Sequence, residues 1–235
     1  MPPALASKSA SGPIETALKI NMISSVLPDP DSLKGYSFMG REYAPFTVGH
    51  RFRIHPPDDN PVQDDRLPLV MASGAFGSGE HETTASCLEI LEDLPDLTDK
   101  TLLDLGSGTG ILAIAALKLG ASHALCVDID PAAVVTCQHH SHLNGVFDKI
   151  DHLCGTLDQV AAGSFDLILA NIYGDILLAV ADALVPKAAP GAHILLSGML
   201  WEYNYDVRQK YERLGCQVIR NRMLDEFSTV LMQKI

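Results

Sequence analysis

Residues 101–112 read TLLDLGSGTGIL, an apolar run that breaks into three alternate glycines and then becomes apolar again. The pattern predicts a strand, a tight turn and a helix, and glycines in such a turn let the backbone approach a nucleotide. The glycines are Gly106, Gly108 and Gly110, whereas the dinucleotide fingerprint G-x-G-x-x-G needs its third glycine where Ile111 stands. The spacing therefore favours an adenosine with a short chain over NAD, and a purely structural turn is the alternative.

The chain on the carboxyl side of this stretch alternates predicted strands with predicted helices. Continuous apolar strands separated by single helices are typical of a mostly parallel sheet that helices cover on both faces. The sequence thus predicts a doubly wound α/β fold, and the last two strands follow each other closely enough to form an antiparallel pair. We expect helices over 80–94, 110–119, 131–143, 174–187 and 201–214, and strands over 101–105, 124–128, 150–153, 165–171, 192–198, 216–223 and 227–235.

The front of the chain is less regular. Residues 1–45 contain prolines without a clear periodicity, and we expect an irregular amino-terminal arm. Residues 46–78 form a strand-containing lead-in, with extended patches over 46–54 and 66–72 on either side of a turn-rich segment. The regular alternation begins at residue 79, so we expect the main domain to cover 79–235.

Composition and charge exclude several classes of protein. Hydrophobic residues make up 47% of the chain, but no stretch approaches the ~20 uninterrupted apolar residues that span a bilayer, so we expect no membrane partner. The first residues lack the apolar core of a secretory signal, and we expect a cytoplasmic protein. The formal net charge of −12 repels phosphates, which argues against direct nucleic-acid binding and favours a basic partner such as a lysine-rich protein.

Neither the cysteines nor the histidines predict a metal site. The cysteines form no C-x-x-C pair and fall mostly in apolar surroundings, where a free thiol behaves as a small hydrophobe. His139, His140 and His142 share a predicted helix without an acidic or thiolate partner at ligand spacing, so we expect them on a solvated face. His81 lies in GEHET, which is no H-E-x-x-H motif and predicts the entry to a helix. The cysteines are Cys87, Cys126, Cys137, Cys154 and Cys216.

Two polar residues end strands that follow the glycine turn. Asp128 comes about 20 residues after Gly106, where a carboxylate accepts hydrogen bonds from ribose hydroxyls. Capping of the next helix is the alternative, and we assign that role to Asp130. Asn171 ends the strand LILAN, where a simple turn residue is the alternative. Ligands bind at the carboxyl ends of parallel strands where the winding reverses. If the strand that contains Asp104 neighbours the one that ends at Asn171, then Gly106, Asp128 and Asn171 share one crevice.

The stretch from 104 to 134, DLGSGTGILAIAALKLGASHALCVDIDPAAV, resembles the cofactor motif of class I S-adenosylmethionine-dependent methyltransferases. Three further segments narrow the resemblance: GAFGSGEHETT at 74–84, ANIY at 170–173 and LLSGML at 195–200. With them the chain resembles the PrmA family of ribosomal protein L11 methyltransferases over about residues 45–235. The combination of loop, glycine turn and ANIY is specific, whereas the glycine turn alone is not.

This resemblance implies a seven-stranded, Rossmann-like sheet with an antiparallel final strand, and S-adenosyl-L-methionine as cofactor. The implied activity is protein N-methyl transfer to lysine or amino-terminal amines of a ribosomal protein or another lysine-rich protein. Family members carry an amino-terminal recognition domain, and residues 1–45 are expected to form only a reduced version of it. The implied cofactor contacts are Thr84, Gly106, Gly108, Asp128 and Asn171.

Methyl transfer from a sulfonium requires an oriented, neutral amine more than a strong base. The side-chain oxygen of Asn171 and the backbone carbonyl of Ile172 are candidates to accept the N–H groups of that amine, so Asn171 is the candidate catalytic residue. Tyr173 either walls the pocket or packs in the core. A small-molecule methyltransferase, an NAD-dependent oxidoreductase and a catalytically silent scaffold are the alternative functions, and Ile111 counts against the oxidoreductase.

Overall fold

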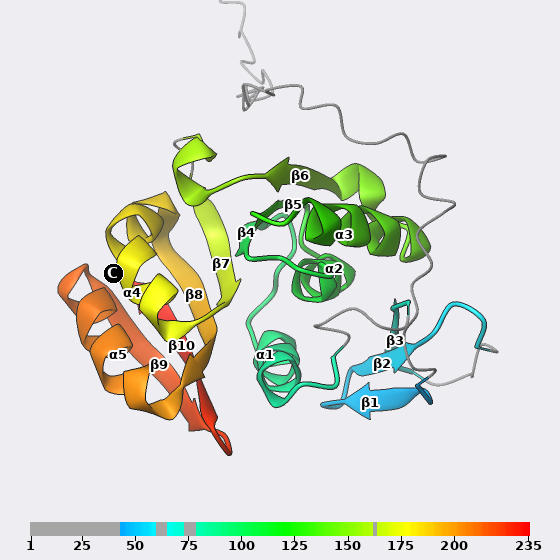
Figure 1. Cartoon of the computed structure of the whole chain (residues 1–235), viewed down its shortest axis with the longest axis horizontal. Coiled ribbons are helices and arrows are strands. Elements are labelled where there is room, and N and C mark those ends of the chain that lie inside the picture. Colours follow the sequence, from blue (N-terminus) through cyan, green and yellow to red (C-terminus); the bar gives the residue numbers. More distant parts are fainter. Residues whose placement is uncertain (1–42, 60–64, 73–78, 162–163) are drawn as a thin grey trace, which may run out of the picture.

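The computed structural model describes residues 43–59, 65–72, 79–161 and 164–235 (Figure 1). The irregular arm expected over 1–45 lies outside the described residues except for 43–45. The elements in chain order are β1 (Phe46–Val48), β2 (Phe52–His55), β3 (Leu67–Val70), α1 (Glu82–Glu92), β4 (Thr101–Leu105), α2 (Ile111–Lys118), β5 (His123–Asp128), α3 (Pro131–Leu143), β6 (Ile150–Cys154), β7 (Phe165–Asn171), α4 (Gly174–Leu184), β8 (Ala188–Leu200), α5 (Asn204–Arg213), β9 (Cys216–Met223) and β10 (Phe227–Lys234).

Seven strands form the main sheet in the order β6-β5-β4-β7-β8-β10-β9. Strands β4 to β8 pair in parallel, and β10 runs antiparallel to both β8 and β9. The winding reverses at β4, which lies between β5 and β7, so the carboxyl ends of these three strands meet at one edge. The predicted doubly wound, mostly parallel sheet with an antiparallel final strand is confirmed.

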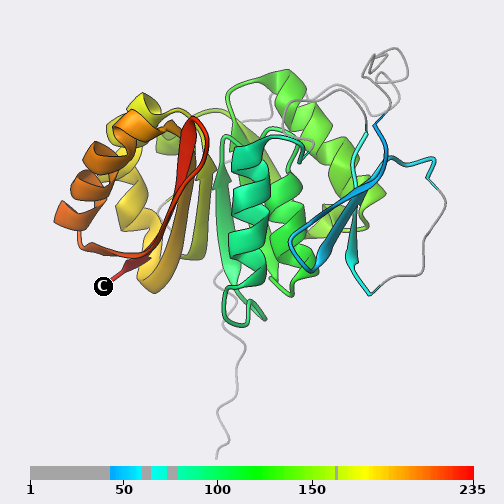
Figure 2. The same cartoon turned by 90° about the horizontal axis from the view of Figure 1, so that it is seen from below.

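Helices cover both faces of this sheet, α1, α2 and α3 on one and α4 and α5 on the other (Figures 1 and 2). Alternate residues of β4 show why: Leu102 belongs to the core under α1 and α2, whereas Leu103 and Leu105 belong to the core under α4 and α5. Both faces of each central strand are therefore buried, which explains the continuous apolar runs in the sequence.

The lead-in forms a separate sheet in the order β1-β2-β3, whose apolar face joins the core around α1 and α2. The segment 46–54 is not one extended patch as predicted, because the chain turns at Gly49, whose φ of +58° suits glycine. The carboxylate of Glu92 in α1 accepts hydrogen bonds from the backbone N–H groups of His50 and Arg51, which fastens this turn to the main domain.

Four of the five predicted helices are shorter in the structure, and α4 and α5 each border a 3-10 turn. The helix α4 ends at Leu184, and a 3-10 turn over Val185–Lys187 follows because Pro186 cannot donate the next helical hydrogen bond. The segment Trp201–Tyr203 is likewise a 3-10 turn that precedes α5. Conversely, β8 begins at Ala188 and extends the strand predicted over 192–198 in both directions. Within the described ranges, no helix has the length and apolarity that a membrane crossing requires.

Candidate active site

The glycine turn connects β4 to α2 and is packed tightly on two sides. Gly106 has a φ of +72°, and a side chain there would collide with Ile172 after β7. Gly110 precedes α2 with a φ of +78° and lies against the Sγ atom of Cys137 in α3. A Cβ atom on Gly108, in contrast, would meet no atom of the described chain within 4 Å. The turn is therefore fixed by its neighbours and leaves space beside Gly108.

Asp128, the last residue of β5, supports this turn directly. Its Oδ2 atom accepts a hydrogen bond from the backbone N–H of Gly108 at 2.8 Å, and its Oδ1 atom accepts one from Asp130 at 3.0 Å. Asp130 is the N-cap of α3, because its side chain accepts a hydrogen bond from the N–H of Ala132 at 2.9 Å. The prediction that Asp130 caps the helix is confirmed, and Asp128 has a different position beside the open space at Gly108.

Asn171 lies on the other side of the turn. The pairing of β7 with β4 places Ala170 opposite Leu105, so Asn171 ends β7 where the glycine turn begins. The Nδ2 atom of Asn171 donates a hydrogen bond to the Oγ1 atom of Thr84 at 3.4 Å, and Thr84 is buried in the first turn of α1. The fold therefore brings the glycine turn, Asp128, Thr84 and Asn171 to one edge of the sheet, as the sequence predicted for the strand ends.

Gly198 is a site residue that the sequence analysis missed. It lies in β8 beside Asn171, with a φ of +79°. A Cβ atom at this position would approach the Oδ1 atom of Asn171 to 2.9 Å and the backbone N and O atoms of Ile172 to 2.8 Å. Only glycine allows β8 to pack this closely against the Asn171 amide and the Ile172 backbone. In the sequence, the feature that could have indicated Gly198 is a lone glycine inside the apolar strand motif LLSGML.

Asp104 is a second residue that was missed. It lies in β4 just before the glycine turn and is 1% exposed. Burial and the negative charges of the Cys137 thiolate and the Asp128 carboxylate raise the pKa of Asp104 to about 8, although the backbone N–H of Ala113 opposes this shift. Its Oδ2 atom has no hydrogen-bond partner within the described part of the chain. A buried carboxyl group with a raised pKa therefore lies beneath the turn. In the sequence, the feature that could have indicated it is a single acidic residue inside the apolar run TLLDL.

The helix α3 contributes a histidine to the support of the turn. His140 is buried, and its Nδ1 and Nε2 atoms lie 3.0 Å from the Thr109 carbonyl and 2.9 Å from the Ala72 N–H. The carbonyl can only accept and the N–H can only donate, so the ring is neutral, and burial lowers its pKa to about 4. The expectation of a solvated face was wrong for His140, because the lead-in covers this side of α3. The described residues contain no cluster of potential metal ligands.

The entry to α1 borders the same edge of the sheet. His81 is the N-cap of α1, which confirms the predicted helix entry, and its ring contacts Phe227 edge-on with centroids 5.1 Å apart. The carboxylate of Glu82 accepts a hydrogen bond from the N–H of Asp225 at 3.2 Å. The turn between β9 and β10 is thereby held against the start of α1, close to Thr84.

The family model described as ribosomal protein L11 methyltransferase (PrmA) matches residues 37–234. The chain belongs to this family. Proteins named ribosomal protein L11 methyltransferase from Trichlorobacter lovleyi and Yersinia pestis are 42% and 40% identical to it over 177 and 171 residues, which is 72% of this chain in both cases. The matched parts make up 58% of each relative's length.

The solved structures agree with the family in fold. A ribosomal protein L11 methylase from Lactobacillus delbrueckii subsp. bulgaricus has a TM-score of 0.74 and 27% identity, covering 83% of this chain and all of that one. An RNA methyltransferase from Salinibacter ruber in complex with S-adenosyl-L-homocysteine has a TM-score of 0.51 at 17% identity, covering 63% of this chain and 90% of that one, and shows the shared fold alone. The class I methyltransferase fold predicted from the sequence is confirmed.

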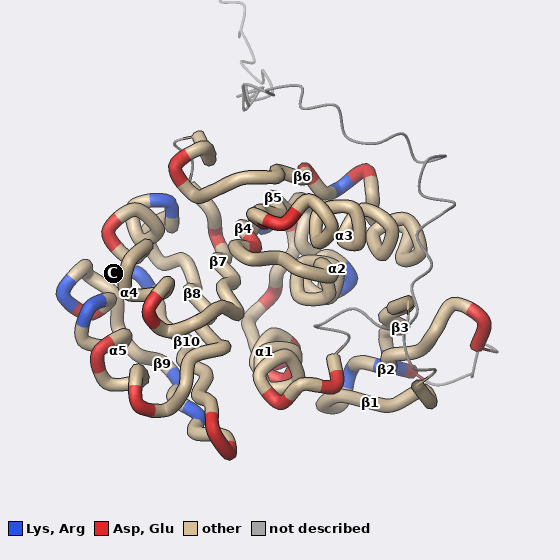
Figure 3. The backbone as a smooth tube through the Cα atoms, in the orientation of Figure 1, with Lys and Arg blue, Asp and Glu red and all other residues tan. Residues whose placement is uncertain are grey.

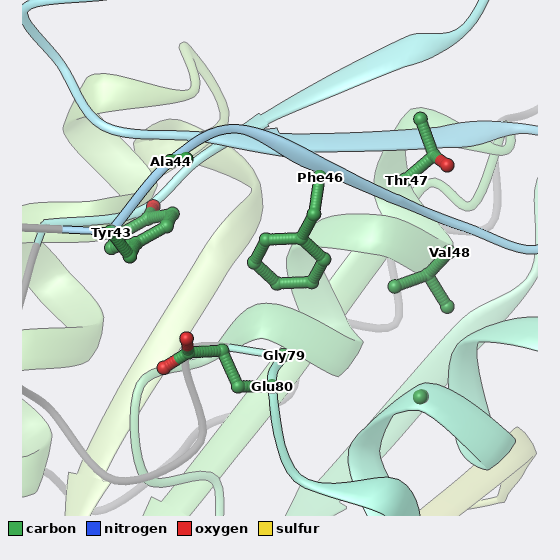
Figure 4. A pocket seen from close by; sticks show the side chains of 8 residues that line it. Tyr43, Ala44, Phe46, Thr47, Val48, Gly79 and Glu80 are labelled. Atoms are coloured by element: carbon green, nitrogen blue, oxygen red, sulfur yellow. The ribbon is translucent and has the colours of Figure 1, made fainter.

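A pocket of about 650 Å³ lies between the lead-in and the start of α1 (Figure 4). The hydroxyl group of Tyr43 donates a hydrogen bond to the carbonyl of Met71 at 2.6 Å, and burial, Glu80 and Asp59 raise the pKa of Tyr43 to about 12. None of the five predicted cofactor contacts lines this pocket. Its lining residues are Tyr43, Ala44, Phe46, Thr47, Val48, Gly79, Glu80 and Ala85.

Proposed function

We propose that this chain is an S-adenosylmethionine-dependent N-methyltransferase that acts on a lysine or amino-terminal amine of a protein, with residues 79–235 as the methyltransferase domain and 46–78 as its lead-in. The observation that carries the proposal is the meeting of the glycine turn, Asp128 and Asn171 at the point where the winding of the sheet reverses. Membership of the PrmA family supports the same reaction and cofactor.

The residues at this edge fit the cofactor in two respects. The open space beside Gly108 has room for a ligand that approaches the backbone closely. Asp128 borders that space with a carboxylate that can accept hydrogen bonds from ribose hydroxyls in addition to the N–H groups it already binds. When bound, S-adenosylmethionine supplies the methyl group from a sulfonium. Thr84, Gly106, Gly108, Asp128 and Asn171 are the residues that we assign to its binding.

The acceptor chemistry is assigned to Asn171. Its Nδ2 atom donates a hydrogen bond to Thr84, and we assign its Oδ1 atom to the incoming amine. An amide oxygen accepts an N–H hydrogen bond from a neutral amine and thereby fixes the direction of the nitrogen lone pair. Asn171 thus orients the nucleophile, which is the main requirement of methyl transfer.

Two measurements test this function. Calorimetry should show binding of S-adenosylmethionine and S-adenosylhomocysteine and no binding of NAD, and binding of NAD alone would contradict the proposal. Incubation with methyl-labelled S-adenosylmethionine and either recombinant ribosomal protein L11 or a fractionated cell extract should place the label in protein. Label found only in the metabolite fraction would instead establish a small-molecule methyltransferase.

A further inference from the structure

An exposed aromatic patch borders the proposed active site. Tyr173, Trp201 and Tyr205 are 70%, 58% and 64% exposed, although large aromatic side chains usually bury most of their surface. Ile176 and Leu200 are also exposed large apolar residues in the same segments. Tyr173 therefore neither packs in the core nor lies in an enclosed pocket. We refer to these five residues as the aromatic patch.

The fold places the members of the patch together. Asn171, the last residue of β7, pairs with Ser197 of β8, so the chain that follows β7 begins beside the last residues of β8, which ends at Leu200. A side chain on Gly174 would collide with the ring of Tyr203, which shows that the start of α4 touches the 3-10 turn before α5. Tyr173, which precedes Gly174, thus lies next to the contact with Tyr203, and Ile176 follows in the first turn of α4.

The patch is also connected to the site. Leu200 pairs with Phe227 across β8 and β10, and the ring of Phe227 contacts His81 at the entry to α1. Three residues further along α1 lies Thr84, the partner of Asn171. Asn171 itself is two residues before Tyr173 in the chain. A protein segment that reaches the Asn171 amide from this side must therefore cross the aromatic patch.

The surroundings of the patch are acidic. The segments 171–176, 200–206 and 224–227 contain five carboxylates and no lysine or arginine. Within the described chain none of the five carboxylates forms an ion pair, and all belong to exposed residues. Figure 3 shows acidic residues at the start of α4 and at the turn between β9 and β10. The five are Asp175, Glu202, Asp206, Asp225 and Glu226.

One of the aromatic rings already binds a cation within the protein. The guanidinium of Arg208 lies 6.0 Å from the centroid of the Tyr205 ring, and its Nε atom donates a hydrogen bond to Asn204 at 2.9 Å. Aromatic faces attract ammonium and guanidinium groups, and a carboxylate beside them adds direct charge attraction. Exposed aromatic rings next to carboxylates that form no ion pair are therefore suited to bind a protein segment in which basic side chains alternate with apolar ones.

We propose that the aromatic patch and its carboxylates form the docking surface for the lysine-containing segment of the protein acceptor. Basic residues of that segment lie against the carboxylates and the exposed rings of Trp201 and Tyr173, and its apolar residues cover Leu200 and Ile176. The segment is thereby held with its acceptor amine directed towards Asn171. The inference that this surface docks the methyl acceptor rests on the proposed function, whereas its preference for segments with basic and apolar side chains does not.

Binding is tested with two fluorescent probes, recombinant ribosomal protein L11 and a short peptide of alternating lysine and leucine. Fluorescence anisotropy should show that Trp201→Ala weakens binding of both probes by roughly 10- to 30-fold, as truncation of a central interface tryptophan does. Because this variant keeps the formal charge of −12, its effect cannot come from overall charge. Glu202→Lys should also weaken binding and reduce its dependence on salt.

Ile219→Ala is the matched control, since Ile219 is a 49% exposed apolar residue on β9 outside the patch. It should bind both probes as the wild type does. Equal binding by wild type, Trp201→Ala and Glu202→Lys would overturn the docking surface, and so would a wild type that binds neither probe. If the wild type binds through Trp201 but transfers no methyl group, the docking surface is upheld and only the proposed function fails.

Discussion

The carboxylates of Asp128 and Asp130 lie two residues apart and allow the roles of turn support and helix capping to be separated. Asp128 accepts hydrogen bonds from Gly108 and Asp130, whereas Asp130 accepts one from Ala132 at the start of α3. Only the first carboxylate borders the open space at Gly108, so only its removal should affect the cofactor directly.

The expected size of the effect follows from these bonds. A hydrogen bond to a charged group contributes about 1.5–3 kcal/mol, so Asp128→Ala should raise the Kd of S-adenosylhomocysteine by about 10- to 100-fold. Asp130→Ala removes an N-cap, which costs about 1 kcal/mol of the free energy of unfolding. It should change the Kd by less than about two-fold, because the cap lies on α3 and leaves the Gly108 bond intact.

Isothermal titration calorimetry with S-adenosylhomocysteine measures the Kd of the wild type and both variants, and urea denaturation measures their free energies of unfolding. The cofactor role of Asp128 is wrong if Asp128→Ala folds and binds S-adenosylhomocysteine as tightly as the wild type. It is also wrong if Asp130→Ala loses as much affinity, because the two carboxylates would then act only through the stability of the loop.

Three further predictions concern the support of the site. Gly198→Ala pushes a methyl group against Asn171 and should lower the methyl-transfer rate about ten-fold or more while the Kd of S-adenosylhomocysteine changes less, as single-turnover kinetics and calorimetry will show. In the folded protein the pKa of His140 is lowered from 6.5 to about 4, so the free energy of unfolding should fall by about 3 kcal/mol as the pH is lowered from 6.5 to about 4. His140→Gln should not show this part of the fall when urea denaturation is measured at each pH. In the folded protein the pKa of Asp104 is raised from 3.8 to about 8, so its contribution to the free energy of unfolding is present at low pH and is lost as the pH rises from 3.8 through about 8. In urea denaturation over this pH range, Asp104→Asn should lose less of its free energy of unfolding than the wild type.

Much of the fold followed from hydrophobic patterning. The continuous apolar runs of β4, β5 and β7, separated by helices, predicted a parallel sheet. The position of β4 between β5 and β7 was only a condition for the shared site, and the structure supplies it. Helix ends were less predictable, since the end of α4 depends on Pro186 and the start of α5 on the packing of Tyr203 against Gly174. The hairpin at Gly49 was missed because its anchor, Glu92, is distant in sequence.

Some residues of the candidate site could likewise be predicted from the sequence, and others could not. Asp128 and Asn171 could be placed because they end apolar strands, and parallel strands present their carboxyl ends at one edge. Gly198, Asp104 and His140 could not be assigned from local sequence, because their roles depend on contacts with β7, α2 and the lead-in. A helical histidine reveals nothing of the backbone groups that cover it, and the expectation of a solvated His140 failed for that reason.

The most direct test of methyl transfer at this site compares Asn171→Ala with the wild type, using methyl-labelled S-adenosylmethionine and recombinant ribosomal protein L11 under single-turnover conditions. The proposed role of Asn171 predicts that the wild type transfers label to protein and that the variant loses about 100-fold or more of the rate, while its Kd for S-adenosylhomocysteine rises less than about ten-fold. A rate and an affinity that fall in the same proportion would make Asn171 only a cofactor contact. A wild type that binds the cofactor and methylates neither L11 nor any other protein of the cell extract would contradict the central claim.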